Sequence, residues 1–298
     1  MPKNLLFLLI LFNPLVTYGQ SYGERFSALF EKKDTAGQRI LLEEWQQNDS
    51  NDAELYIGWF NYYINLSKTG GLRLDTRVKE GEEALMLQDS NSDTVAFILE
   101  ETFYQQQLLD EGFRNIEKGI SKHPKRLDMR FGHIYMLGEN QQYDRFTEEI
   151  VNAIHYSDKI KNQWLWSEGK PLEDAENFML TSLQDYVMTL YNTMDDSLMK
   201  KIGEIATTVL RYHPKHVESL SNLALVHLVA GEYEKALEPL LSAEKLSPDD
   251  WIVLNNIAYA YKNLGEKKKA RKYYEKVLKL GDEDAQARAR EELEKLKD

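Results

Sequence analysis

The sequence predicts an all-α fold, a solenoid of stacked helical repeats that ends in a C-terminal capping helix. Residues 217–250 and 251–284 superpose when one window is shifted by 34, so that Ala224 falls on Ala258. Apolar residues also recur at intervals of three and four along most of the chain, which is the spacing of an amphipathic helix. A fixed period of this length is typical of stacked repeats, in which each unit packs only against its neighbours.

The first twenty residues are predicted to be a signal peptide. Lys3 precedes an unbroken apolar run from Leu5 to Phe12, and Gly19 is the best candidate for the last residue removed. The apolar run is too short to span a bilayer. We therefore expect an exported chain, periplasmic or secreted, with no membrane segment after cleavage and no lipid anchor. An uncleaved anchor or a buried first helix is the alternative.

The N-terminal half of the chain is also expected to be helical. We find no convincing run of alternating strand character, and clusters of Asn, Asp, Ser and Gly separate the periodic segments. Residues 21–92 are predicted to form divergent helical pairs, and residues 93–160 to form two degenerate repeats, windows 93–126 and 127–160. The expected helices of the first segment lie near 22–32, 34–47, 52–67 and 77–88.

The positions of three prolines extend the 34-residue period toward the N-terminus. Pro214 and Pro248 lie 34 residues apart and each follows a predicted helix, whereas Pro124 lies 90 residues before Pro214, which is two periods and 22 residues. The additional 22 residues predict an insertion between the two prolines, at residues 161–182. Residues 285–298 are expected to form the capping helix, because the end of a solenoid needs a polar outer surface.

The repeats of residues 183–284, of which the two superposing windows are the clearest, resemble the tetratricopeptide repeat (TPR) family. Small residues of that family are matched by Ala224 and Ala236, and Gly231 ends the first helix in a conformation that other residues adopt at a cost. The resemblance implies a right-handed superhelical solenoid of antiparallel helix pairs, whose first helices line a concave surface.

In the resembled family the concave surface commonly holds an extended or helical peptide. The resemblance therefore implies a non-enzymatic scaffold of the bacterial envelope or secreted space, with a protein or peptide as partner. Asparagine can hold a peptide backbone because its side chain both donates and accepts hydrogen bonds. Asn222 and Asn256 can equally bridge neighbouring helices, and both interpretations stay open. The candidate peptide-binding residues are Ser221, Asn222, Leu225, Asn255, Asn256 and Tyr259.

Aromatic residues mark a second group of candidate partner contacts. Tyr56, Trp59 and Tyr63 share one face of a predicted helix, and Trp164 and Trp166 lie in the predicted insertion. The helix is interpreted either as buried between its neighbours or as an aromatic floor for a ligand. These residues support the alternative function, a structural or regulatory subunit that docks on an envelope assembly through its aromatic N-terminal half or its insertion.

Composition narrows the functional classes further. The net charge of −12 argues against nucleic acid as a partner, and the absence of cysteine excludes disulfides and thiolate catalysis. His213 and His216 lack the glutamate of a metal-binding helix motif, and no glycine-rich phosphate loop is present. We expect no metal and no cofactor, and an enzyme of unrecognised type is the third functional alternative. Nothing in the sequence indicates an oligomeric state.

Overall fold

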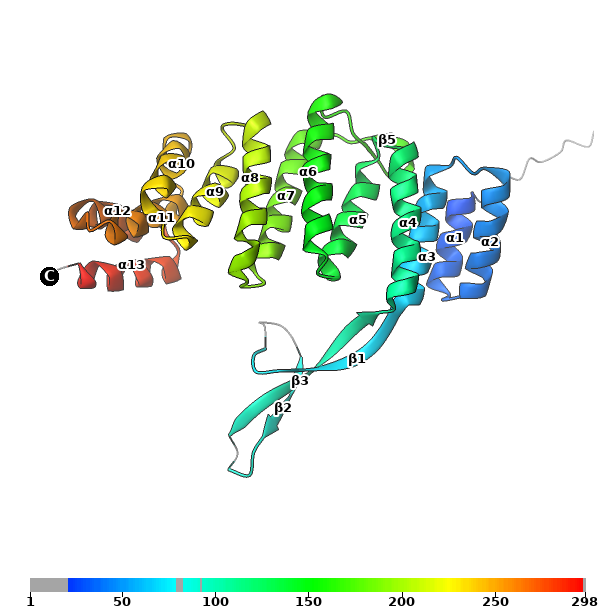
Figure 1. The fold of residues 1–298 in the computed structure, drawn as a ribbon, viewed down its shortest axis with the longest axis horizontal. Coiled ribbons are helices and arrows are strands. Elements are labelled where there is room, and N and C mark those ends of the chain that lie inside the picture. The colour runs from blue at the N-terminus through cyan, green and yellow to red at the C-terminus, as the bar shows by residue number, and fades with distance from the viewer. Residues whose placement is uncertain (1–20, 79–82, 92, 297–298) are drawn as a thin grey trace, which may run out of the picture. The chain divides into compact units, whose positions relative to one another are not determined.

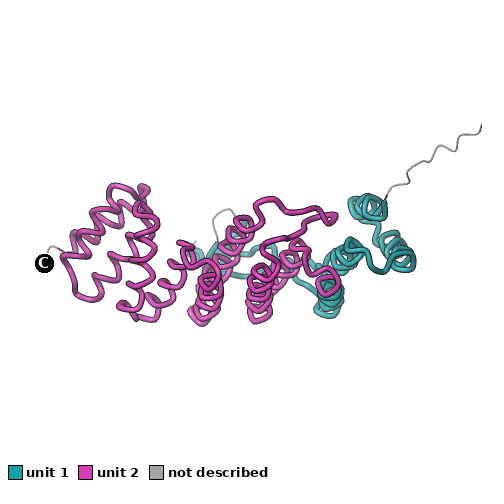
Figure 2. Tube along the Cα trace, turned by 90° about the horizontal axis from the view of Figure 1, so that it is seen from above, with its two compact units in different colours: residues 1–118 teal, residues 119–298 magenta. Residues whose placement is uncertain are grey.

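The computed structural model describes residues 21–78, 83–91 and 93–296, so the predicted signal peptide lies outside the described residues. The described residues are mainly helical and contain thirteen α-helices, which confirms the predicted fold class. The chain forms two compact units, unit 1 up to residue 118 and unit 2 from residue 119 (Figure 2).

Unit 1 starts with two helices joined by a tight turn, α1 (Tyr22–Glu31) and α2 (Thr35–Asn48), and continues with α3 (Ala53–Ser67). The three helices confirm those predicted near 22–32, 34–47 and 52–67. Each begins at a side-chain cap, in which the oxygen of Ser21, Asp34 or Asp52 accepts a hydrogen bond from a backbone N–H of the first turn.

A three-stranded antiparallel sheet follows α3, with strand order β1-β3-β2. The expectation of a helix at 77–88 and of no strands is therefore wrong, and so is the interpretation of window 93–126 as a helix pair. Strand β3 is rich in β-branched and aromatic residues, which pack well on a pleated surface. The strands are β1 (Lys68–Asp75), β2 (Ala84–Gln88) and β3 (Thr94–Tyr104).

The sheet is an excursion inside a helix pair, between α3 and α4 (Gln106–Lys122), as Figure 1 shows. Strand β1 starts directly after α3, and the backbone N–H of Gln105 donates to the carbonyl of Ser67 at 2.8 Å, which closes the excursion. Gly112 of α4 then lies against α3, because an added Cβ would stand 3.2 Å from Ile64 Cδ1. Helices α3 and α4 thus form one pair, whose turn is replaced by residues 68–105.

Unit 2 continues with helix pairs and a single last helix. Three of its pairs are joined by three-residue turns with a positive φ at the middle residue, which is Gln141, Gly231 or Gly265. Glycine adopts this conformation at no steric cost. The helices are α5 (Leu127–Glu139), α6 (Tyr143–Lys159), α7 (Ala175–Tyr191), α8 (Met199–Tyr212), α9 (Val217–Val229), α10 (Tyr233–Leu246), α11 (Trp251–Asn263), α12 (Lys267–Leu280) and α13 (Glu283–Lys295).

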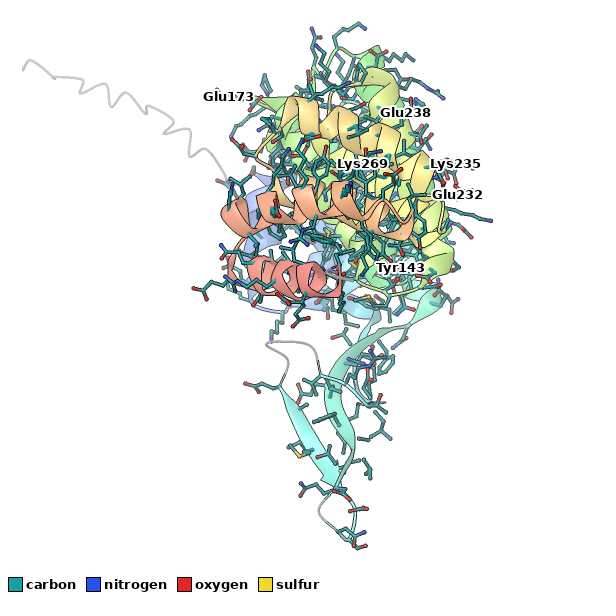
Figure 3. All side chains as sticks on the ribbon, turned by 90° about the vertical axis from the view of Figure 1, so that its left-hand side faces the viewer. Tyr143, Glu173, Glu232, Lys235, Glu238 and Lys269 are labelled. Atoms are coloured by element: carbon teal, nitrogen blue, oxygen red, sulfur yellow. The ribbon has the colours of Figure 1, made fainter. Side chains whose placement is uncertain are left out.

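The turn between α9 and α10 is held by a small charged cluster. The Glu232 carboxylate contacts Lys235 Nζ and His227 Nδ1, both at 2.8 Å, and Figure 3 labels Glu232 and Lys235 at the start of α10. The hydrogen bond from Lys235, followed by that with His227, holds the pKa of Glu232 below its usual value. This cluster adds side-chain contacts to a turn whose backbone already depends on Gly231.

Residues 160–174 separate α6 from α7 and contain a short hairpin. Its strands β4 (Leu165–Trp166) and β5 (Lys170–Pro171) flank a single 3-10 turn, η1 (Ser167–Gly169). The backbone N–H of Leu165 donates to the carbonyl of Lys125 at 2.8 Å, which holds the hairpin against the start of α5. The hairpin falls within the predicted insertion at residues 161–182, but α7 already starts at Ala175.

His133 of α5 is buried, with 4% of its surface exposed. Burial, and to a lesser degree the positive charges of Arg145 and Arg130, lower its pKa to about 3. An unfolded chain binds a proton at this histidine below its ordinary pKa of about 6.5, whereas the folded chain stays neutral until about pH 3. Stability is therefore lost as the pH falls through this window.

We predict that His133→Gln reduces the acid sensitivity of the fold. The neutral side chain cannot be protonated, so about 2 kcal/mol of the stability lost between pH 7 and pH 5 should disappear. Urea unfolding of both proteins at several pH values measures this difference. Parallel curves of stability against pH would contradict the burial of a neutral histidine.

Candidate functional site

The first helices of the repeats keep a common phase along the chain. Helices α3, α9 and α11 each follow a four-residue linker, residues 49–52, 213–216 and 247–250. Counted from the first helical residue, the candidate residues on α9 and α11 occupy positions five, six and nine of each helix. Residues at the same count therefore occupy corresponding positions on the first helices of the two units.

In unit 1 the same positions line a groove of about 280 Å³ between α1 and α3. Positions two, five, six and nine of both helices contribute, together with one residue each from the end of α1 and from α2. These residues are not among the sequence-predicted candidates, although most of them occupy helix positions equivalent to those of the candidates on α9 and α11. The lining residues are Gly23, Phe26, Ser27, Phe30, Glu31, Trp45, Glu54, Ile57, Gly58 and Asn61.

Helix α1 forms one wall of the groove, and contacts with α2 hold α1 in place. The Tyr22 ring stacks on the Trp45 ring with centroids 5.3 Å apart, and the Arg25 guanidinium pairs with the Glu44 carboxylate at 3.3 Å. The Tyr22 hydroxyl also donates to Glu44 at 3.1 Å. The hydrogen bond from Arg25, followed by that from Tyr22, lowers the pKa of Glu44, so the Glu44 carboxylate stays negatively charged in this contact.

Close packing of α3 on α2 forms the floor of the groove. A Cβ at Gly58 would lie 2.8 Å from Leu42 Cδ2, so a larger residue there would require the buried Leu42 side chain to shift. The Trp45 side chain lies beneath, buried, with its Nε1 donating to Asp52 Oδ2 at 3.1 Å. Because Asp52 also caps α3, its carboxylate connects Trp45, in the floor of the groove, to the start of α3, which forms the second wall.

The groove combines an apolar lining with acidic groups. The Phe30 side chain keeps 39% of its surface exposed, and Ile57 is half-buried. Glu31 and Glu54 bring one carboxylate from each wall, and the exposed Asn61 amide can both donate and accept. Such a surface can bury a large apolar side chain and attract a positive charge beside it.

The arrangement of the helices identifies the type of repeat. Turns of three residues and linkers of four recur from α1 to α12, and alanines of the clear repeats, such as Ala224, Ala236, Ala258 and Ala270, are fully buried between helices. The chain is a TPR-like repeat protein. The predicted resemblance to the TPR family is thereby confirmed.

Comparison with known proteins gives remote matches. The family model "Regulator of microtubule dynamics protein 1-3" matches residues 194–297, and no curated protein matches. A thermophilic TPR protein of Thermus thermophilus is 16% identical over 62% of this chain and 91% of its own, with a TM-score of 0.38. The C-terminal part of a TPR repeat-containing protein of Cytophaga hutchinsonii is 14% identical over 87% and 78%, with a TM-score of 0.42.

A third solved structure is that of YrrB, a TPR protein described as having an unusual peptide-binding site. It is 10% identical over 84% of this chain and 97% of its own, with a TM-score of 0.42. Identities and TM-scores this low say nothing about what the present chain binds.

The part of the chain that the structure describes was also searched for metal sites and for membrane-spanning helices. No group of three or more His, Asp or Glu side chains there could hold a metal ion. No helix there is long and apolar enough to cross a membrane.

The candidate residues on α9 and α11 lie on the first helices of two TPR-like pairs. Asn222 is buried and its Nδ2 donates to Gln184 Oε1 of α7 at 2.8 Å, so it bridges neighbouring helices. Ser221, Leu225, Asn255 and Asn256 are half-buried. Tyr259 is 40% exposed, and its ring stands 6.1 Å from that of Tyr233.

The aromatic candidates on α3 mostly serve packing. Tyr56 and Trp59 are buried, with the Tyr56 hydroxyl donating to the carbonyl of Ser50 at 2.7 Å and Trp59 Nε1 donating to Gln46 Oε1 at 3.0 Å. Tyr63 is half-buried and stacks on Trp59, and burial followed by the Glu111 charge raises its pKa. The side of α3 that lines the groove is the one without large aromatic residues.

The two tryptophans of the hairpin segment differ in their surroundings. Trp164 is 1% exposed and its Nε1 donates to Ser157 Oγ at 2.7 Å, so it belongs to the core of unit 2. Trp166 is half-buried, with its ring 5.0 Å from that of Phe178. Trp166 is therefore the one that keeps surface for a partner.

We predict that the two tryptophans have unequal effects on stability. Trp164→Ala should lower the free energy of unfolding by about 3–5 kcal/mol, because it leaves a cavity in the core. Trp166→Ala should cost no more than about 2 kcal/mol, because only part of the ring is buried. Chemical denaturation measures both, and equal losses would show that Trp164 is not the core residue described above.

Proposed function

We propose that this protein is a non-enzymatic scaffold that binds a protein or peptide segment on the first helices of its repeats, with the groove between α1 and α3 as the principal site. The observation that carries the proposal is the lining of this groove. Positions two, five, six and nine of two successive first helices meet there around an apolar floor, and two carboxylates stand at its sides. A concave apolar site with few polar groups is the usual form of a binding site.

The lining also suggests the chemistry of the ligand. A large apolar side chain would contact Phe30 and Ile57, which keep exposed surface, while a lysine or arginine next to it would meet Glu31 or Glu54. Asn61 could hold a backbone amide of the same segment. We therefore propose a basic and hydrophobic segment as the ligand in unit 1.

The corresponding positions of α9 and α11 favour a more polar ligand. Asn255, Asn256 and Tyr259 offer amide and hydroxyl groups where α1 and α3 offer Phe30 and Ile57. We propose that these residues, with Ser221 and Leu225, contact a separate segment of a partner. Docking through Tyr56, Trp59 or Trp164 receives no support, because those side chains are buried.

Binding to a selected peptide tests the groove. A peptide taken from a random library with the full-length protein should lose about tenfold or more in affinity with Phe30→Ala, because the ring is the exposed apolar anchor. Glu54→Lys should weaken the same peptide and reduce the dependence of its affinity on salt. Isothermal titration measures both effects.

Two control variants lie away from the groove. Ile40→Ala removes a side chain of α2 that is 66% exposed, and Glu234→Lys reverses an exposed charge on α10. Neither should change the affinity. If selected peptides bind the two groove variants as tightly as the wild-type protein, the groove is not the site.

We further propose that the protein acts outside the cytoplasm, in the periplasm or as a secreted protein. The charged start, short apolar run and small residue at Gly19 support export. Mass spectrometry of the protein from its native host should find Gln20 as the first residue, in the envelope or the medium. A cytoplasmic protein that keeps Met1 would contradict the proposal.

A further inference from the structure

The three-stranded sheet of unit 1 carries an apolar face that the proposed groove does not use. Leu74, Ile98 and Leu85 stand in one row across the strands, because Leu74 and Leu85 both pair with Ile98. Leu72 lies two residues before Leu74 and therefore points to the same side of β1. We call these four residues the leucine face. Its three leucines are between 68% and 71% exposed.

The surface of the leucine face is hollowed. One hollow of about 580 Å³ has Leu72 and Leu85 in its lining, and a second of about 430 Å³ has Leu72 and Gly70. Glu100 also lines both hollows, so the two adjoin. A Cβ at Gly70 would meet nothing within 4 Å, which leaves the second hollow open. An exposed apolar patch of this kind marks a contact with another macromolecule.

The opposite face of the sheet is occupied by ion pairs. There Arg73 pairs with Asp75 and, at 3.3 Å, with Glu101. Met86 is 56% exposed on that face, but it stands in the row of Asp75, because both residues pair with Phe97. The two faces therefore differ, since one has paired charges across it and the other offers leucines.

Two carboxylates border the leucine face. Ala84 pairs with Leu99, so the register places the preceding Glu83 opposite the following Glu100. Both glutamates are exposed and line the larger hollow, and neither has an ion-pair partner in the described part of the chain. Like charges directly opposite each other destabilise a sheet. A cation between them would relieve the repulsion, so the border of the face is suited to a positive charge from a partner.

The dimensions of the leucine face match one helix. Neighbouring strands lie about 4.8 Å apart, so the row from Leu74 to Leu85 spans about 10 Å. An α-helix with its side chains is about 10–12 Å across. A small sheet with an apolar face gains stability when a helix packs on that face. Figure 1 shows the strands running away from α3 and α4, so neither of these helices covers it.

We propose that the leucine face binds an amphipathic helix of a protein partner. Apolar side chains at intervals of three and four along the partner helix lie over Leu72, Leu74 and Leu85. A lysine or arginine beside them lies between Glu83 and Glu100. The apolar contact supplies the affinity, and the cation sets the orientation of the helix. No residue of the groove takes part, so this contact and the proposed function can fail independently.

Charge and geometry favour this occupant over two others. An anionic membrane would be repelled by Glu83 and Glu100 and by a chain whose net charge is −12. A strand added at the edge of β1 would reach Leu74 but would leave Leu85, two strands away, exposed. A helix across the face covers both leucines and brings a cation to the carboxylates.

Helices selected from a library test the proposal on the full-length protein. Each library helix has about 18 residues, which is five turns, with leucines along one side and random residues elsewhere. Leu85→Ser should weaken the selected helices about tenfold, because it removes an exposed apolar side chain from the contact. Met86→Ser is the matched control, since Met86 follows Leu85 in β2, is also exposed and faces the other side of the sheet. It should leave the affinity measured by isothermal titration unchanged.

A charge exchange supplies the second measurement. The selected helices should carry a lysine or arginine beside their leucines, and Glu100→Lys should weaken their binding about tenfold. A helix in which glutamate replaces that cation should bind Glu100→Lys more tightly than it binds the wild-type protein. Phe30→Ala, in the groove, should change none of these affinities, so the outcome is separate from that of the proposed function.

Four results would overturn the proposal. The first is a selection in which no helix depends on both Leu85 and Glu100, and the second is an equal loss with Met86→Ser. The third is a loss with Leu74→Ser but not with Leu85→Ser, which would indicate a strand paired with the edge of β1. The fourth is wild-type binding to phosphatidylserine vesicles that Leu85→Ser abolishes, which would indicate a membrane surface.

Discussion

Close approach of helices at buried alanines is the constraint on which the repeat architecture depends. Ala224, Ala236, Ala243, Ala258 and Ala270 have no exposed surface, and a larger side chain at any of them would overpack the contact. Because the helices meet at fixed points, most turns within the pairs have three residues and most linkers between the pairs have four. These recurring lengths bring positions two, five, six and nine of the first helices to the same side of the repeat.

The β-sheet and the hairpin segment respect this constraint because each begins and ends at neighbouring points of the backbone. The sheet closes at Ser67 and Gln105, so α4 starts beside the end of α3, and Gly112 of α4 lies against Ile64 of α3. The second segment closes on itself through the hydrogen bond from Leu172 N–H to the Trp164 carbonyl, 3.0 Å, and is anchored to Lys125. Such excursions add surface without changing the phase of the helices, and surface of this kind can evolve separately from the scaffold.

Periodicity predicted the helices well because helix packing and helix pattern obey the same spacing. The sheet escaped prediction for a local reason. Strand β2 reads Ala-Leu-Met-Leu-Gln, a sequence of strong helix formers, and it is a strand because β3 offers a hydrogen-bonding edge beside it. In β1 the alternation is confined to the four residues Leu72–Asp75. The strand signal was clearest in β3, where valine, isoleucine, threonine and aromatic residues dominate.

The groove was harder to predict than the helices that form it, because large aromatic residues draw attention and are also the residues that a core buries most readily. On α3 the aromatic side packs inward and the plainer side, with Ile57, Gly58 and Asn61, meets α1. The residues at positions two, five, six and nine differ from one helix pair to the next, whereas the location of these positions on the first helix stays the same. The scaffold therefore fixes where a partner can bind, and the residues at a few repeated positions determine which chemistry it finds there.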